Sequence, residues 1–272
     1  MFSKTDTAAL PVVAVIAAAG SGTRLGADQP KAFVELAGRT LVERALDGLA
    51  SSGVVGRTFV MISPDMQGRM AEILDDPANQ AAWAGMRVST GTGGSERSDS
   101  VFAGLQLVEG ELGSPVDCVE CAQVDEAIVL VHDAARCLTP PAMIAQVVEQ
   151  VRAHGEAGTA AGVVPTLPVT DTIKTVEDGM VTGTPARDGL VAVQTPQGFL
   201  FSVLMDANRK YQAGLELGRG HARLATDDAS IMELADYPVT ITDGDDRAMK
   251  ITTPRDFAIA EMMVKQGRNE HP

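Results

Sequence analysis

Short apolar runs rich in β-branched residues alternate with segments of helical periodicity along most of this chain of 272 residues. Runs that are apolar at every position are typical of strands covered on both faces by helices. The alternation therefore predicts an α/β fold with a doubly wound, mostly parallel, Rossmann-like sheet. The expected strands are Val12–Ala17, Thr58–Ile62, Met86–Ser89, Ala127–Val131, Thr159–Val164 and Val239–Thr242.

Helices are expected between and after these strands, and several begin at a proline or a small polar residue. We expect the whole chain, residues 1–272, to form one domain, in which the acidic segment from Gly110 to Glu126 is a long irregular connection without an assigned role. The expected helices are Leu41–Ser51, Gln67–Leu74, Ser98–Val108, Pro140–His154, Phe201–Gln212, a short helix after Thr226, and Pro254–Gln266.

The pattern changes between residues 166 and 193 to short β-like pieces separated by glycines and a proline. This predicts a β-arm, a hairpin-like excursion from the sheet. A two-stranded ribbon on its own is marginal in water. We therefore expect the arm to fold over the active site or to reach a second subunit.

Charge and cysteine content exclude several kinds of partner. The net charge of -14 argues against nucleic acid as a ligand, because most of the surface would repel its phosphates, although a few cations gathered in a cleft still suit a small anion. The chain has 3 cysteines, which suits a reducing compartment, and we treat the C-x-x-C pair Cys118 and Cys121 as incidental. The apolar run Leu10–Ala19 is too short to span a membrane and is interpreted as a buried strand, so a cytoplasmic protein is expected.

A glycine-rich loop follows the first expected strand, with the sequence AAAGSGTRLGADQPK from Ala17 to Lys31. Its glycines allow backbone amides to approach phosphate oxygens at the carboxyl edge of the sheet. The spacing is neither that of a P-loop nor a clean G-x-G-x-x-G, because Leu25 occupies the third glycine position, which argues against a dinucleotide site. Arg24 and Lys31 are placed to neutralise charge on a phosphate, although either one taken alone could be a solvated loop cation.

A second candidate is the His132-Asp133 pair at the end of the fourth expected strand. One carboxylate at that edge, together with phosphate oxygens, is a usual provision for Mg²⁺, so Asp133 is the predicted metal ligand. The alternative is an ordinary ion pair with Arg136 or a turn cap. We interpret His132 as structural.

A third candidate is the segment GGSERSDS, residues 93–100, a glycine turn that leads into a helix. Its amides and hydroxyls could bind a base or an anion, although helix capping by Ser95 or Ser98 also explains them. No spacing rule singles out the polar residues Thr172, Arg187, Thr195, Thr226 and Lys250 further along the chain.

Taken in order, the segments AAAGSGTRLGADQPKAF, GGSERSDSV, LVHDAAR, DTIK, VQTPQGF, TDDAS and KIT resemble those of the 2-C-methyl-D-erythritol 4-phosphate cytidylyltransferases of non-mevalonate isoprenoid synthesis. The resemblance covers nearly the whole chain. Two positions depart from the family pattern: Ser95 stands where an acidic residue is usual, and Cys137 where a proline is common. The segments 75–85 and 110–126 also look longer than the family core. Ribitol-5-phosphate cytidylyltransferases are the family most similar to the methylerythritol phosphate enzymes.

The resemblance implies roles for individual residues. Arg24 and Lys31 would stabilise the transition state, and Asp133 would bind Mg²⁺. It also implies a homodimer, in which the arm embraces the partner subunit. The nucleotide would be bound by Ala18, Ala19, Gly20, Gly22, Gly94, Ser95, Ser100, Asp133 and Ala134, and the acceptor phosphate by Arg187 and Lys250 with Thr172, Thr195 and Thr226.

The expected function is therefore transfer of CMP from CTP to 2-C-methyl-D-erythritol 4-phosphate, giving 4-diphosphocytidyl-2-C-methyl-D-erythritol and pyrophosphate. Ribitol 5-phosphate is the alternative acceptor. A nucleotide-binding module without turnover, or an NAD-type oxidoreductase, is the alternative of another class.

Overall fold

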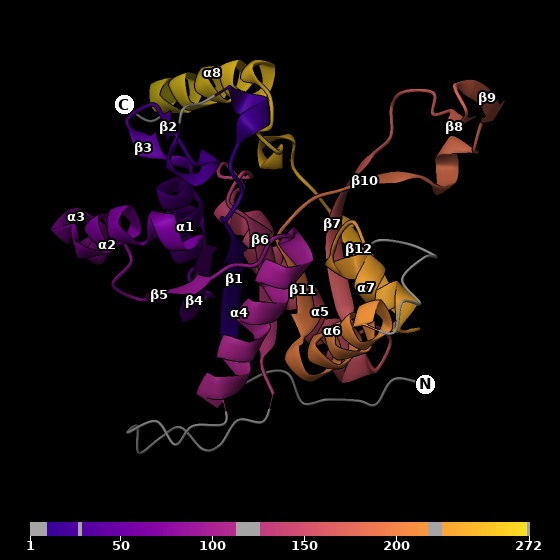
Figure 1. The fold of residues 1–272 in the computed structure, drawn as a ribbon, viewed down its shortest axis with the longest axis horizontal. Helices are drawn as coiled ribbons and strands as arrows, with labels where there is room; N and C mark the ends of the chain where they lie inside the picture. The colour runs from indigo at the N-terminus through magenta and orange to yellow at the C-terminus, as the bar shows by residue number, and fades with distance from the viewer. Residues whose placement is uncertain (1–9, 27–28, 113–125, 217–224, 271–272) are drawn as a thin grey trace.

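The computed structural model describes residues 10–26, 29–112, 126–216 and 225–270 of the chain. A central sheet of eight strands organises these residues, as Figure 1 shows. The strands follow the order β10-β7-β11-β6-β1-β4-β5, and β12 pairs with β7. Their bounds are β1 Val12–Ala17, β4 Arg57–Ile62, β5 Arg87–Thr92, β6 Ile128–Asp133, β7 Gly162–Pro168, β10 Val191–Val193, β11 Gln197–Leu200 and β12 Val239–Asp243.

Most strand pairs are parallel, which confirms the predicted fold class. Strand β1 runs parallel to β4 and to β6, β4 to β5, and β7 to β12. Strand β11 is antiparallel to both of its neighbours, β6 and β7, and the sequence did not reveal it. This strand has only four residues, and they include Gln197 and Gly198. Such a short segment shows no regular alternation of apolar and polar side chains, which is the signal that predicts a strand.

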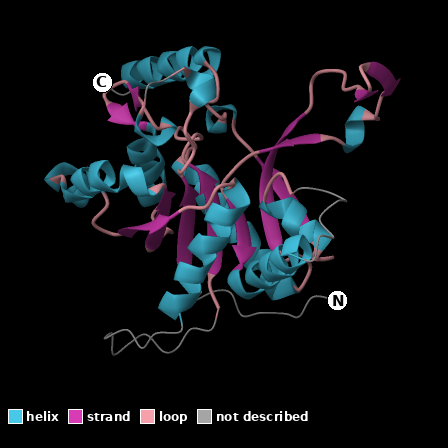
Figure 2. Cartoon of the chain, viewed as in Figure 1, coloured by secondary structure: helices cyan, strands magenta, loops and turns pink. Residues whose placement is uncertain are grey.

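Helices cover both faces of the sheet (Figure 2). Helices α1, α2, α5 and α8 pack into one hydrophobic cluster, and α4, α6 and α7 into another, while the short α3 contacts α1 and α2. Helix α8 lies beside a small hairpin of β2 and β3. The bounds are α1 Leu41–Ser51, α2 Gln67–Asp75, α3 Pro77–Ala82, α4 Arg97–Leu112, α5 Pro141–Ala157, α6 Phe201–Glu216, α7 Asp228–Leu234, α8 Pro254–Glu270, β2 Glu35–Leu36 and β3 Arg39–Thr40.

Strand β1 shows why the apolar runs are continuous. Val12, Ala14 and Ile16 pack into the first cluster, whereas Val13 and Val15 pack into the second. Successive side chains of a strand point to opposite faces, so both sets must be apolar when both faces are covered. The same two-sided burial holds β1 in the centre of the sheet, directly before the glycine-rich loop.

The ends of several helices follow local capping rules. Helix α1 begins at Thr40, whose side chain accepts a hydrogen bond from the Glu43 amide while the Glu43 carboxylate accepts one from the Thr40 amide. Helix α5 ends at Gly158, which adopts the left-handed conformation with φ of 67°. These caps set where the chain turns back toward the sheet.

The arm is present, with ends that differ from the predicted ones. Strands β8 (Thr175–Glu177) and β9 (Met180–Gly183) form a hairpin that projects from the body of the molecule at the upper right of Figure 1. The ends of the predicted excursion, however, pair within the main sheet, because β7 continues to Pro168 and β10 starts at Val191. The arm proper therefore spans residues 169–190.

The acidic segment from Gly110 to Glu126 is partly helical, which corrects the expectation of an irregular connection. Helix α4 continues to Leu112 because nothing between Val108 and Leu112 terminates it. The remainder of the segment, with Cys118 and Cys121, lies outside the described residues. Within the described ranges, no helix has the length and apolar character needed to cross a bilayer.

Gly104 determines how closely α4 approaches the sheet, because a Cβ atom there would collide with Cγ1 of Val15. Replacing glycine by alanine inside a helix normally stabilises it by about 1 kcal/mol. Overpacking a filled core costs about 1–3 kcal/mol, so we expect Gly104→Ala to lower the free energy of unfolding, measured by urea denaturation. Gly110→Ala in the same helix is the control, since a Cβ there meets no atom within 4 Å. Equal effects of the two substitutions would contradict this packing argument.

Candidate active site

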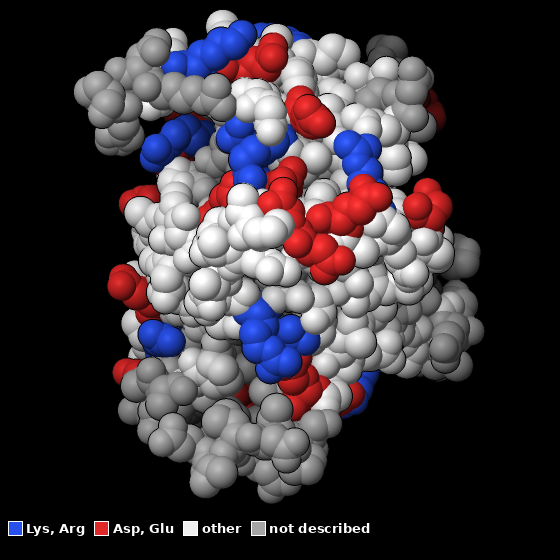
Figure 3. Space-filling model, turned by 90° about the vertical axis from the view of Figure 1, so that its left-hand side faces the viewer, with Lys and Arg blue, Asp and Glu red and all other residues white. Residues whose placement is uncertain are grey.

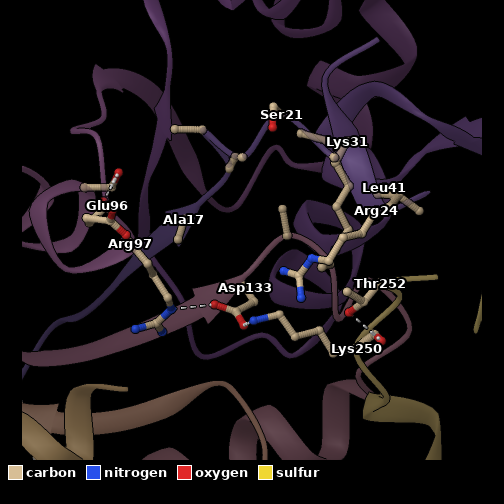
Figure 4. A pocket seen from close by; sticks show the side chains of 18 of the residues that line it. Ala17, Ser21, Arg24, Lys31, Leu41, Glu96, Arg97, Asp133, Lys250 and Thr252 are labelled. Carbon is tan, nitrogen blue, oxygen red and sulfur yellow. Dashed lines mark hydrogen bonds and ion pairs between the residues drawn. The ribbon is translucent and has the colours of Figure 1, made fainter. Parts of the chain in front are cut away.

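A pocket of about 300 Å³ opens at the carboxyl ends of β1 and β6 (Figure 4). The parallel register pairs Ala17 with Asp133, so the loops that follow these two strands start side by side. The pocket is lined by every residue predicted to bind nucleotide, and by Arg24 and Lys31. In full, these are Ala18, Ala19, Gly20, Gly22, Arg24, Lys31, Gly94, Ser95, Ser100, Asp133 and Ala134.

Gly22 shapes the glycine-rich loop. Its φ is +76°, and a Cβ atom there would lie 2.7 Å from Cβ of Lys31. The loop closes through hydrogen bonds from the Leu25 amide to the Gly22 carbonyl at 2.8 Å, and from the Lys31 amide to the Gly20 carbonyl at 3.4 Å. A glycine at position 22 is therefore needed to bring Lys31 back across the loop and into the pocket.

The segment before α4 forms the opposite wall. A Cβ atom on Gly93 would lie 2.9 Å from Cβ of Ala19, so the two loops touch at this glycine. The buried Ser100 hydroxyl accepts a hydrogen bond from the Gly94 amide at 3.0 Å, and the Ser95 hydroxyl donates to Asp99 at 2.9 Å. Both predicted serines line the pocket, and in this structure their hydroxyls maintain the shape of the loop.

Arg24 and Lys31 are two cations without an ion pair to any residue that the structure describes, and both line the pocket. Lys31 is about half-buried, and burial lowers the pKa of its ammonium to about 8, with repulsion from Lys250 and Arg24 acting in the same direction. Removing the charge of Lys31 from water without a partner is unfavourable, so this position is suited to an anionic ligand. The exposed Arg24 adds a second positive charge to the same pocket.

Asp133 is held between two other cations at the end of β6, as Figure 4 shows. Arg97 Nε donates to Oδ1 at 2.8 Å, and Lys250 Nζ lies 2.7 Å from Oδ2. Burial alone would raise the pKa of this carboxyl, but Arg97 and Lys250 outweigh it and hold the pKa well below its usual range. Asp133 is therefore an ionised carboxylate at neutral pH.

Arg136, the alternative partner considered for Asp133, donates instead to the carbonyl groups of Ala248 at 2.7 Å and Val193 at 3.1 Å. Sequence inspection missed Arg97 as a partner. It stands inside the segment 93–100, but 36 residues separate it from Asp133, and the sequence carries no signal for that pairing.

A second and larger pocket, of about 840 Å³, adjoins the first and shares Arg97, Asp133 and Lys250 with it. Thr195, Thr226 and Lys250, three of the predicted acceptor residues, line this pocket. The other two, Thr172 and Arg187, lie on the arm outside both pockets, where Arg187 donates to the Thr170 carbonyl at 2.7 Å.

His132 lies behind the site and lines neither pocket. Its Nδ1 is 3.0 Å from the Thr195 hydroxyl, and that hydroxyl accepts a hydrogen bond from the Asp133 amide at 3.1 Å. Burial lowers the pKa of His132 to about 4, so the ring is neutral at physiological pH. This arrangement gives His132 a structural role in fixing the backbone at Asp133.

Among the residues that the structure describes, no three His, Cys, Asp or Glu side chains gather into a metal site. A metal ion in the first pocket would therefore have to take most of its ligands from phosphate and water. Asp133 suits such an ion because its carboxylate is ionised and lines the pocket beside the glycine-rich loop.

A glycine-rich loop, two cations without ion pairs in the described part of the chain, and a buried carboxylate, all at the carboxyl edge of a mostly parallel sheet, define an enzyme of the nucleotidyltransferase class. The sequence model of the family described as IspD, 2-C-methyl-D-erythritol 4-phosphate cytidylyltransferase, matches residues 12–266. The chain belongs to this family.

Individual relatives agree with that assignment. The chain is 46% identical over 271 residues to the 2-C-methyl-D-erythritol 4-phosphate cytidylyltransferase of Corynebacterium jeikeium, covering 93% of this chain and 97% of that protein. The enzyme of the same name from Corynebacterium efficiens is also 46% identical, with 94% of each chain covered. The crystal structure of the Thermus thermophilus enzyme superposes with a TM-score of 0.64 at 26% identity, over 92% of this chain and 98% of that one.

The lowered pKa of Lys31 predicts a pH dependence of the reaction. Lys31 is charged below pH 8 and loses its proton as the pH rises through about 8, so kcat/KM for CTP should fall above that pH. An arginine side chain stays protonated throughout this range. Lys31→Arg should therefore move the fall to higher pH, measured from initial rates between pH 6.5 and 10, and an unchanged alkaline limb would contradict the assignment to Lys31.

Proposed function

We propose that this chain transfers CMP from CTP to 2-C-methyl-D-erythritol 4-phosphate and releases pyrophosphate. The observation that carries the proposal is that two cations, Arg24 and Lys31, stand beside a glycine-rich loop without an ion pair to any described residue, in a pocket that adjoins a second pocket. Two substrates that react with each other need two adjoining sites. The family to which the chain belongs supports the choice of substrates.

In the proposed reaction, a phosphate oxygen of the acceptor attacks the α-phosphorus of CTP. A new P–O bond forms as the bond to the bridging oxygen breaks, and the electron pair leaves with pyrophosphate. The second pKa of a phosphate monoester is about 6, so the acceptor is already a nucleophilic dianion at neutral pH and needs no enzymic base. Arg24 and Lys31 neutralise the charge that develops on the transferred phosphoryl group and on the leaving group.

Mg²⁺ is the proposed cofactor, and Asp133 is the residue that would hold it. When bound, the ion would neutralise charge on the triphosphate and orient its oxygens. Oδ2 of Asp133 is the better placed oxygen, because its partner Lys250 is 42% exposed and reaches it by a single contact. Lys250, freed from Asp133, lies where the second pocket begins and can pair with the acceptor phosphate.

The acceptor is proposed to occupy the second pocket, against Thr195 and Thr226. Ribitol 5-phosphate is the alternative acceptor, since it is a polyol phosphate of similar size. We expect purified protein with CTP and Mg²⁺ to release pyrophosphate with methylerythritol phosphate and much more slowly with ribitol 5-phosphate, measured by a coupled phosphate assay. The opposite preference would change the proposed acceptor, and release with neither would contradict the proposed function. Activity that is lost in EDTA and restored by Mg²⁺ would support Mg²⁺ as the cofactor.

The proposed assembly is a homodimer in which the arm lies against the partner. The arm carries exposed apolar side chains, among them Val176, Val181 and Met180, which is 71% exposed. Large exposed apolar patches are characteristic of protein interfaces. Thr172 and Arg187 stand on the same arm, so a dimer gives these two predicted acceptor residues a route to the partner's second pocket.

An arm variant tests this assembly. We expect the double substitution Val176→Lys and Met180→Lys to convert a dimer into a monomer, measured by size-exclusion chromatography with light scattering, because a charge is costly to bury in an apolar interface. Met262→Lys is the control, since Met262 is an exposed methionine on α8 away from the arm. A wild-type monomer, or an arm variant that remains dimeric, would contradict the proposal.

The cytoplasm is the proposed location. The small, odd number of cysteines supports it, and the described Cys137 is a buried free thiol. Burial raises the pKa of this thiol to about 12, which keeps it protonated and unreactive. On the face shown in Figure 3, acidic and basic side chains are interspersed, which is consistent with the expectation that nucleic acid is not a partner.

A further inference from the structure

Arg97 occupies a position that its own helix does not favour. It is the first residue of α4, and the N-terminus of a helix carries a partial positive charge that repels a cation. Its side chain instead turns toward the sheet and lines both pockets. The reason for an arginine here must lie in what it contacts.

The guanidinium of Arg97 joins two carboxylates that come from different elements. Nε donates to Oδ1 of Asp133 at the end of β6, and Nη2 donates to Oδ2 of Asp228 at the start of α7, both at 2.8 Å. Asp228 is 131 residues from Arg97 along the chain. The planar fork of an arginine can hold two such contacts at once in a fixed geometry, whereas a lysine cannot.

The burial of the Asp228 carboxyl group is energetically unfavourable. Its side chain is 0% exposed, and its second oxygen, Oδ1, has no hydrogen-bond partner in the described part of the chain. An ionised carboxylate in the core is unfavourable unless it is paired, and Arg97 is the cation that pairs with it. Packing alone would be served better by an apolar side chain at position 228.

The two cations on Asp133 are held very differently. Lys250 contacts Oδ2 alone and its side chain is 42% exposed, so it can exchange with solvent or with a ligand. The side chain of Arg97 is 25% exposed and forms ion pairs with two carboxylates, Asp133 through Nε and Asp228 through Nη2. Oδ1 of Asp133 is therefore the fixed oxygen, and Oδ2 is the one that can change partner.

We propose that Asp228 is a positioning residue for the reaction: it holds Arg97 against Oδ1 of Asp133, so that the carboxylate presents Oδ2 to the first pocket. The inference rests on the proposed role of Asp133. Thr226, two residues before Asp228, lines the second pocket. The start of α7 thus contributes both to the acceptor side and to the orientation of the carboxylate on the nucleotide side.

Three substitutions in the full-length protein test the inference. Asp228→Asn replaces the carboxyl group that accepts from Arg97 Nη2. Arg97→Lys keeps the charge at position 97 but removes the fork, and Asp133→Asn removes the carboxylate that is positioned. Asp47→Asn is the matched control, because Asp47 accepts two hydrogen bonds from Arg39 outside both pockets. Each variant is assayed for kcat with CTP, Mg²⁺ and the acceptor, and for the dissociation constant of CTP in EDTA by calorimetry.

We expect Asp228→Asn and Arg97→Lys each to lower kcat by on the order of tenfold to a hundredfold, the usual effect of a small displacement at a reacting centre. The dissociation constant of CTP in EDTA should change by less than about threefold, because no metal then depends on Asp133. Asp47→Asn should retain wild-type values of both quantities.

Two results would overturn the inference. One is an Arg97→Lys variant with wild-type kcat, which would show that the fork is not needed. The other is a loss of CTP affinity in proportion to kcat in both variants, which would show that they only disturb the fold. If Asp228→Asn fails to fold, Arg97→Lys alone decides. An active Asp133→Asn variant would remove the proposed role of Asp133 itself, and with it the reason for positioning it.

Discussion

The Asp133 carboxylate, held between Arg97 and Lys250, is the interaction on which the arrangement of both pockets depends. Four cations line the first pocket: Arg24, Lys31, Arg97 and Lys250. Repulsion from Lys250 and Arg24 contributes to the lowered pKa of Lys31. The Asp133 carboxylate forms ion pairs with Arg97 and Lys250, whereas Arg24 and Lys31 have no ion pair among the described residues. A ligand with several phosphate oxygens would complete this balance. The overall charge of -14 therefore says little about the site, because the cations that matter are local.

The position of this carboxylate follows from the parallel sheet. Strands β1 and β6 pair so that Ala17 lies opposite Asp133, and their following loops leave the same edge together. An antiparallel partner would have sent one of the two loops to the far side of the sheet. The glycine at position 22 then folds the first loop tightly enough for Lys31 to return to that edge. Strand order and a single permissive backbone position thus assemble cationic and anionic groups from distant segments.

Much of the fold could be predicted because its elements carry strong local signals. Strand β1 and helix α5 are long, periodic and clearly bounded, and both were expected close to their observed positions. The elements that were missed are short: α3 has 6 residues and β11 has 4. The arm was recognised from its turn residues, but its ends were not, because pairing with the main sheet at β10 is a tertiary contact.

The sequence by itself determined the alternation of strands and helices, the place of the glycine-rich loop, and the two cations within it, since each is encoded in a window of a few residues. Tertiary structure alone decided that Asp133 pairs with Arg97 and Lys250 rather than with the nearby Arg136. It also decided that Asp228 anchors Arg97 from 131 residues away. Periodicity and turn chemistry act between neighbours in the chain, whereas an ion pair depends on which side chains the completed sheet brings within reach.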